Sequence, residues 1–299
     1  MKKVLNLAMV FALTAFFVAC SDNEENVPTT GNLTVDFTGL ETLGADFVYE
    51  GWLIVDGTPV STGTFTSVTF PQTFTVDIND LEDATNFVLS IEPTIDPDPA
   101  PAATKVLAGA FSGNSASVNS DNIVVDAVGD IKSLGASWGK YILATPTDMD
   151  DSNEASVVWF LDNSNAPPAV AGLGLPTLAA GWKYEGWVVI NGTPVSTGTF
   201  TAVDAADDNA ATSPYKGTTG NGPGYPGEDY VMGTSAGVNF PTDLKGATVV
   251  ISVEPSPDNS AAPFTLKPLA HVVPANAMNH TVLNMEAGPN KVLTGSVTR

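Results

Sequence analysis

Cysteine, histidine and basic residues are scarce in this chain of 299 residues. Cys20 is the one cysteine, which excludes an internal disulfide and any metal site built from several cysteines. Lysine and arginine number 11 against 33 aspartate and glutamate residues, for a formal net charge of −22. A chain this acidic repels nucleic acid and anionic lipid surfaces, so neither is an expected partner. After the first 20 residues, no apolar run is long enough to span a membrane.

The N-terminus carries an export leader. Lys2 and Lys3 precede an apolar stretch, residues 4–18, that is short for a transmembrane helix and typical of a signal peptide. Its end, Phe17-Val18-Ala19-Cys20, resembles the lipobox of bacterial lipoproteins. This resemblance implies a signal peptide at 1–19, lipid (palmitate) on Cys20 and membrane attachment through it. Residues 20–31 are then an acidic tether, typical of an outer-membrane or cell-surface protein of a Gram-negative bacterium. The alternative is an ordinary cleaved signal with an incidental cysteine.

An internal repeat dominates the remaining sequence. Residues 49–66 recur at 184–201, an offset of 135, whereas Glu92 and Glu254 match at an offset of 162. The difference of 27 residues is a net insertion in the second copy, within the glycine- and aspartate-rich tract at about 203–237. The repeat predicts two homologous domains, residues 32–146 and 147–299.

Each copy has the pattern of strands joined by tight turns. Asp56-Gly57 and Asn191-Gly192 favour type I′ hairpin turns, and Pro59 and Pro194 place the following segment at a sheet edge or in a loop. Further strands are predicted at 74–78, 87–91, 123–128, 157–161 and 247–253, and short helical turns at 81–83 and 243–245. Glycine and proline, at 27 and 22 residues, suit this arrangement. The predicted fold is all-β, with two tandem antiparallel β-sandwich (Ig-like) domains.

The repeated motif resembles the C-terminal extracytoplasmic domain of anti-sigma-K factors. The motif residues are Tyr49, Glu50, Gly51, Trp52, Gly57 and Glu92 in the first copy, and Tyr184, Glu185, Gly186, Trp187, Gly192 and Glu254 in the second. In that family a cytoplasmic sigma-binding segment and a membrane helix precede the domain, and neither is expected here. The resemblance therefore implies an envelope module without direct contact to a cytoplasmic sigma factor.

The repeated glutamates admit two interpretations. They either form small polar or cation sites in pairs, or they accept backbone N–H groups at strand ends and stabilise the fold. Acid-base catalysis by such a pair would require two carboxylates with separated pKa values on either side of a substrate. Their spacing in the sequence does not provide this, and glycoside hydrolysis is disfavoured.

Other side chains suggest weaker hypotheses. Two acidic clusters are calcium candidates: Asp148, Asp150, Asp151 and Glu154 between the copies, and Asp204, Asp207 and Asp208 in the insertion. His271 and His280 would need carboxylate partners to bind zinc. Tryptophans 52, 159, 182 and 187 are predicted to be core residues rather than a sugar platform, whereas Trp138 is undetermined.

The sequence thus predicts a non-enzymatic, lipid-anchored interaction or sensing module with no required cofactor. Its partner is an envelope protein or ligand that the sequence does not identify. The alternative is a cell-surface protein that binds calcium or glycan through the insertion of the second copy. A secreted hydrolase is disfavoured further, because no Gly-x-Ser-x-Gly elbow is present.

Overall fold

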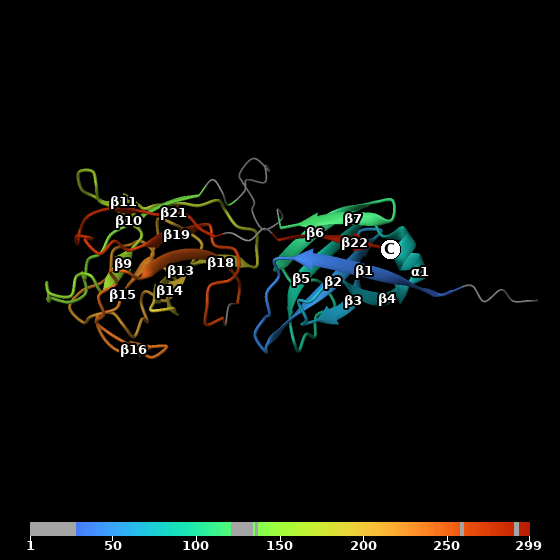
Figure 1. Cartoon of the computed structure of the whole chain (residues 1–299), viewed down its shortest axis with the longest axis horizontal. Helices are drawn as coiled ribbons and strands as arrows, with labels where there is room; N and C mark the ends of the chain where they lie inside the picture. The colour runs from blue at the N-terminus through green and yellow to red at the C-terminus, as the bar shows by residue number, and fades with distance from the viewer. Residues whose placement is uncertain (1–27, 121–133, 135–136, 258–259, 290–292) are drawn as a thin grey trace, which may run out of the picture.

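The computed structural model describes residues 28–120, 134, 137–257, 260–289 and 293–299. The signal peptide, Cys20, most of the tether and the strand predicted at 123–128 lie outside the described residues. Within the described part, no helix has the length and apolar character needed to cross a membrane. The chain forms two β units that lie side by side along the long axis of the molecule (Figure 1).

The first unit contains a single antiparallel sheet of eight strands, in the order β3-β2-β5-β6-β7-β22-β1-β4. Its strands are β1 (Thr30–Thr38), β2 (Phe47–Val55), β3 (Thr58–Phe65), β4 (Gln72–Asp77), β5 (Asn86–Pro93), β6 (Lys105–Ser112), β7 (Ser115–Asn119) and β22 (Thr294–Thr298). One short helix, α1 (Ile78–Asp83), covers the helical turn predicted at 81–83.

The sheet folds over on itself, so that its two halves enclose the core of the first unit. Phe37 of β1 packs against Phe87 of β5, with ring centroids 6.0 Å apart. Phe65 of β3 packs against Phe74 of β4 at 5.7 Å, although β3 and β4 are the two end strands of the sheet. Both halves therefore contribute one face to a common apolar interior, and the predicted all-β, sandwich-like class is confirmed.

The strand β22 enters the first sheet from the C-terminal end of the sequence. It pairs with β1 on one side and with β7 on the other, over five residues on each side. Figure 1 shows this strand, in red, between the blue β1 and the green β7. The sequence predicts residues 147–299 as a contiguous second domain. The structure differs, because β22 supplies Val297, which is fully buried, to the core of the first unit.

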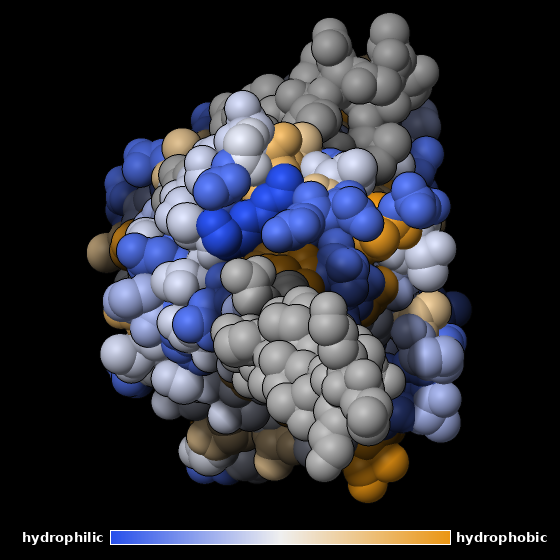
Figure 2. Space-filling model, turned by 90° about the vertical axis from the view of Figure 1, so that its right-hand side faces the viewer, coloured by the Kyte–Doolittle hydropathy of each residue, from blue (hydrophilic) through white to orange (hydrophobic). Residues whose placement is uncertain are grey.

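Arg299 follows β22 and closes the C-terminal end of α1. Its guanidinium donates hydrogen bonds to the carbonyl oxygens of Leu81 and Ala84, at 2.6 and 2.8 Å. These carbonyls lie in and just after the last turn of the helix, where a positive charge is favourable. The face that carries α1 is mostly hydrophilic, with smaller hydrophobic patches (Figure 2).

The second unit is built around a five-stranded sheet in the order β14-β13-β18-β19-β21. Its strands are β13 (Trp182–Ile190), β14 (Thr193–Phe200), β18 (Thr248–Pro255), β19 (Leu269–Val272) and β21 (Glu286–Ala287). Smaller sheets comprise β12 (Leu173–Gly174), β8 (Trp138–Tyr141) and β20 (Leu283–Asn284); β9 (Val157–Trp159) and β15 (Gly227–Asp229); β10 (Leu161–Asp162) and β11 (Val170–Ala171); and β16 (Thr234–Ser235) and β17 (Val238–Asn239). The helical turn predicted at 243–245 is wrong: this segment is a turn in which Asp243 accepts the Lys245 N–H.

The repeated hairpins have the same backbone in both units. Each contains a bulge at the equivalent place, after Gly51 in β2 and after Gly186 in β13. Both turns have positive φ at their two central residues, 50° and 78° at Asp56 and Gly57, and 51° and 85° at the second turn. This is the geometry predicted for type I′ turns. As expected from their prolines, β3 and β14 are end strands of their sheets.

Candidate functional site

The repeated motif forms the same buried hydrogen-bond chain in each unit. Trp52 Nε1 donates to Ser90 Oγ at 2.8 Å, and the serine hydroxyl donates to Glu92 Oε1. Glu92 Oε1 also accepts the backbone N–H of Ala102 at 2.8 Å. The carboxylate thus ties the end of β5 to the loop that leads into β6, and Lys105 Nζ binds the Ala102 carbonyl of the same loop at 3.0 Å.

The second unit repeats this chain bond for bond. Trp187 Nε1 donates to Ser252 Oγ at 2.8 Å, and Ser252 Oγ donates to Glu254 Oε1. Glu254 Oε1 accepts the N–H of Phe264 at 2.8 Å, and Lys267 Nζ donates to the Phe264 carbonyl. Glu92 and Glu254 are 1% and 0% exposed, so both carboxylates are internal to the fold. Their hydrogen bonds stabilise a loop ten residues further along the chain.

The other repeated glutamates, Glu50 and Glu185, accept hydrogen bonds from serine hydroxyls of the neighbouring strand of the hairpin. Ser61 Oγ donates to Glu50 Oε1 in the first unit, and Ser196 Oγ donates to Glu185 Oε1 in the second. Glu50 also lies near Glu92, because it is among the charges that raise the pKa of Glu92; burial is the largest cause of that increase. The structure therefore brings the carboxylates of Glu50 and Glu92 near each other.

The tryptophans separate into buried and exposed residues. Trp52, Trp159, Trp182 and Trp187 are at most 5% exposed and so cannot form a sugar platform on the surface. Trp138 is 52% exposed and lies over Gly174 on the neighbouring strand β12. A side chain at Gly174 would overlap the indole of Trp138.

The histidines and the first acidic cluster are engaged locally. His271 Nδ1 lies 2.9 Å from the Tyr141 hydroxyl, whereas His280 Nε2 lies 4.0 Å from Glu154 Oε2. Asp148 and Asp150 accept hydrogen bonds within their own loop, and Glu154 Oε2 accepts the Thr145 N–H at 2.9 Å. The residues that the structure describes include no group of three or more histidine, cysteine or acidic side chains that could hold a metal ion.

The second acidic cluster divides into exposed and buried side chains. Asp204 is exposed, and Asp208 forms an ion pair with Lys183 at 2.6 Å. Asp207 is only 6% exposed and accepts the Gly227 N–H at 3.0 Å. Two further buried carboxylates, Glu228 and Asp229, follow on β15. Glu228 and Asp229 were not identified from the sequence as buried. The adjacent tyrosine, an aromatic residue within the insertion, is the one sequence feature that could have indicated burial here.

The three buried carboxyl groups have raised pKa values. Burial is the first cause for each of them, and it raises the pKa of Asp207 and of Glu228 to about 7 and that of Asp229 to about 6. Asp229 Oδ2 accepts both the N–H of Thr147, at 2.9 Å, and its hydroxyl. These two hydrogen bonds connect the insertion, through Asp229, to the segment between the repeats, through Thr147.

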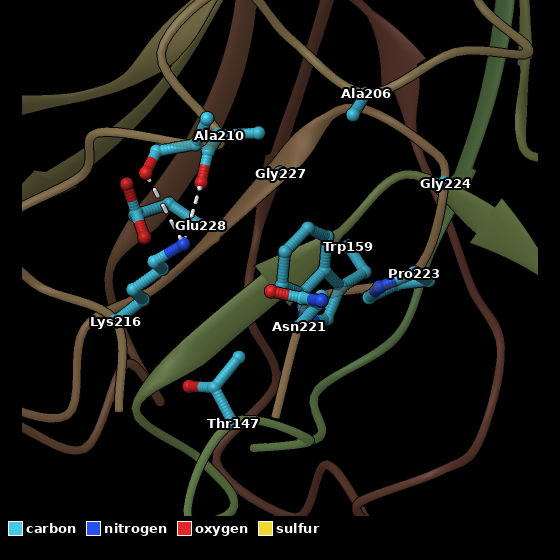
Figure 3. A pocket seen from close by; sticks show the side chains of 12 residues that line it. Thr147, Trp159, Ala206, Ala210, Lys216, Asn221, Pro223, Gly224, Gly227 and Glu228 are labelled. Carbon is cyan, nitrogen blue, oxygen red and sulfur yellow. Dashed lines mark hydrogen bonds between the residues drawn. The ribbon is translucent and has the colours of Figure 1, made fainter. Parts of the chain in front are cut away.

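A small cavity of about 250 Å³ is lined by one of these carboxyl groups, that of Glu228. Glu228, Lys216 and Trp159 border it, with Asn221 and glycines of the insertion (Figure 3). Lys216 Nζ donates to the carbonyl oxygens of Ala210 and Ala211, at 3.2 and 3.4 Å, so its charge is directed into the insertion itself. The described residues that line the cavity include no serine, cysteine or histidine.

We expect the protein to become less stable as the pH rises from about 5 to about 8. Asp207 has a pKa of about 7 in the fold, above the ordinary aspartate value, so its contribution is largest at low pH and is lost as pH rises through the folded value. The expected loss from Asp207 over this range is on the order of 3 kcal/mol, measured by urea unfolding at each pH.

The substitution Asp207→Asn should reduce this pH dependence by the contribution of Asp207, since the amide oxygen still accepts the Gly227 N–H and carries no charge. The contributions of Glu228 and Asp229 should remain. Asp204→Asn is the matched control, because it makes the same chemical change at an exposed aspartate of the same insertion. Equal slopes in the wild type and in Asp207→Asn would contradict the assignment.

The outer face of the second repeated hairpin is covered by the insertion, whereas that of the first hairpin is open. In the first unit the face borders an open groove of about 610 Å³, lined among others by Glu50 and Trp52 of β2, Ser61 and Thr64 of β3, and Asp96 and Asp98 of the segment after β5. In the second unit residues of the insertion lie on the equivalent face. Asp208 Oδ2 binds both Lys183 Nζ and Thr199 Oγ1 at 2.6 Å. Glu185 is consequently 4% exposed, whereas its counterpart Glu50 is half-buried.

Comparison with known proteins agrees with this description over part of the chain. The family described as anti-sigma-K factor rskA, C-terminal, matches residues 25–106. The match extends from before β1 into β6 and includes the first hairpin and Glu92. It covers β1 to β5 and the start of β6, so this part of the first unit is similar to an anti-sigma factor regulatory domain. No curated protein and no solved structure matches the chain.

Proposed function

We propose that the protein is a lipid-anchored envelope module for interaction or sensing, without enzymatic activity. One observation carries this proposal: of two equivalent hairpin faces, the second is covered by the chain's own insertion and the first is open. The similarity of residues 25–106 to the C-terminal region of anti-sigma-K factors supports a regulatory rather than a catalytic role. The second unit, which repeats the same hydrogen-bond chain, is proposed as a further copy of this domain.

The proposed location is outside the cytoplasmic membrane, at the outer membrane or the cell surface. The leader at 1–19 and the sequence around Cys20 support export and lipidation. A lipidated, exported chain does not meet a cytoplasmic sigma factor, so the proposed partner is an envelope protein or ligand. Several acyl chains on one cysteine hold a protein at a membrane more stably than a single chain does.

We expect the wild-type protein to incorporate labelled palmitate and to fractionate with membranes, and Cys20→Ala to lose both properties. Ser21→Ala is the control, because it changes the adjacent residue and leaves the thiol in place. Absence of label from the wild type, or a cytosolic wild type, would contradict the proposed location.

Affinity capture from solubilised envelope then tests the proposed interaction role. A protein that is held by the wild-type chain and eluted intact supports this role, and capture of no protein contradicts it.

A further inference from the structure

The second unit shows what covers a hairpin face of this type. Residues 207–209 of the insertion run along the outer edge of β14, where the Asp208 N–H donates to the Thr199 carbonyl at 2.8 Å. The Tyr230 hydroxyl donates to the Ser196 carbonyl of the same strand at 2.7 Å. An edge strand presents unpaired backbone groups, and these contacts satisfy some of them in β14. The insertion therefore serves as a built-in partner for the second unit.

The first unit has the same edge and no insertion over it. Thr64 of β3 occupies the position of Thr199, and Ser61 that of Ser196, in hairpins with the same register and the same bulge. Among the described residues, no strand pairs with β3 on the side away from β2. Ser61 and Thr64 are exposed, whereas Ser196 and Thr199 are half-buried. The backbone edge that β14 uses internally is thus accessible in β3.

The two faces differ in charge at one position. Lys183 neutralises Asp208 on the second face, but Val48 replaces this lysine on the first. The groove beside β3 carries the carboxylates of Glu50, Asp96 and Asp98, and the described residues that line it include no lysine, arginine or histidine. The negative charges of Asp96 and Glu50 both lie close enough to the buried Glu92 to add to the increase in its pKa, of which burial is the largest cause. A cationic occupant would complement this groove.

We propose that the groove of the first unit binds an extended, lysine- or arginine-bearing segment of a partner protein, which lies along β3 as residues 207–209 lie along β14. The backbone of the segment would pair with the edge of β3, and its basic side chains would reach Glu50, Asp96 and Asp98. Strand addition to an exposed sheet edge is a common mode of peptide recognition, in which backbone bonds give affinity and side chains give specificity. This inference rests on the proposed function as an interaction module.

The test uses the full-length protein and a fluorescent peptide of alternating threonine and lysine, Thr-Lys-Thr-Lys-Thr-Lys-Thr-Lys-Thr, with blocked ends. We expect the wild type to bind it, and the glutamate version of the peptide not to bind. The triple variant Glu50→Gln, Asp96→Asn, Asp98→Asn should weaken binding at least about tenfold, because it removes three charges that a desolvated basic segment would pair with. The control Asp148→Asn, Asp150→Asn, Asp151→Asn removes three acidic charges from the second unit and should leave the affinity within about twofold.

Two methylated peptides test whether the backbone takes part. In one the odd residues carry N-methyl groups, and in the other the even residues do. A strand that pairs through one edge needs the N–H groups of only one set, so one peptide should lose binding and the other should keep it. Equal binding of both, or an equal loss in the two triple variants, would overturn the proposal and leave only the general attraction of an acidic chain for a basic peptide.

The proposed function and the groove can fail separately. If affinity capture from solubilised envelope retains the same protein on the wild type and on the Glu50→Gln, Asp96→Asn, Asp98→Asn variant, the module function stands and the groove assignment is wrong. If the wild type captures no protein but binds the basic peptide as expected, the groove stands and the envelope role is wrong.

Discussion

Val297→Asp is expected to abolish the cooperative folding of the first unit. Val297 is fully buried on β22, between β1 and β7, and lies opposite Val35 on one side and Ala116 on the other. A carboxylate at this place would be enclosed by apolar side chains without a partner. Burial of an uncompensated charge costs several kcal/mol, which is comparable to the whole stability of a domain.

Hydrogen exchange followed by mass spectrometry measures the loss of folded structure in each segment of the chain. Peptides from β1 and β7 should lose protection in Val297→Asp, although the substitution lies nearly 180 residues further along the chain than β7. Thr298→Asp is the matched control, because Thr298 is the next residue, is exposed and points to the other side of the sheet. Native protection of β1 in Val297→Asp would show that β22 is not an essential strand of this sheet.

Trp187→Ala is expected to lower the free energy of unfolding by about 3–5 kcal/mol. Trp187 is 2% exposed, and its indole N–H donates to the serine that orients Glu254. Truncation therefore removes a large buried side chain and one end of the buried hydrogen-bond chain. Because Trp52 makes the same bond in the first unit, Trp52→Ala should have a cost of similar size.

The control for this prediction is Trp138→Ala. Trp138 is 52% exposed, so its truncation should change stability by no more than about 0.5 kcal/mol. Urea unfolding monitored by circular dichroism compares the three variants without relying on tryptophan fluorescence. A cost below about 1 kcal/mol for Trp187→Ala would mean that the repeated tryptophan does not stabilise the fold, and a ligand-binding role would then need to be reconsidered.

Local features of the fold could be predicted from the sequence because they depend on near neighbours. Asp56-Gly57 and Asn191-Gly192 specify their turns through the positive φ that these residue types accept. Pro59 lacks an N–H, which disfavours a central strand, and β3 is an end strand of its sheet. The repeat also indicated that Glu92 and Glu254 have equivalent places, although not that each accepts an N–H ten residues further along.

The remaining features depend on contacts between distant parts of the chain. The pattern of residues 294–298 is that of an ordinary strand, and nothing in it specifies β1 and β7 as neighbours. Asp207, Glu228 and Asp229 are typical surface residues by type, and only the folded insertion buries them. The difference between the open and the covered hairpin face likewise follows from where the insertion packs, which its composition does not reveal.

The return of the chain through β22 has a mechanical consequence. The polypeptide passes from the first unit to the second after β7 and comes back before β22, so two covalent connections join the units. A pull exerted on the second unit against the proposed N-terminal tether would be divided between these connections. Both lead into the same sheet, where β22 lies directly beside β1, the strand that the tether enters. Tension from the second unit would thus reach the proposed tether through two adjacent hydrogen-bonded strands, because two connections rather than one join the units.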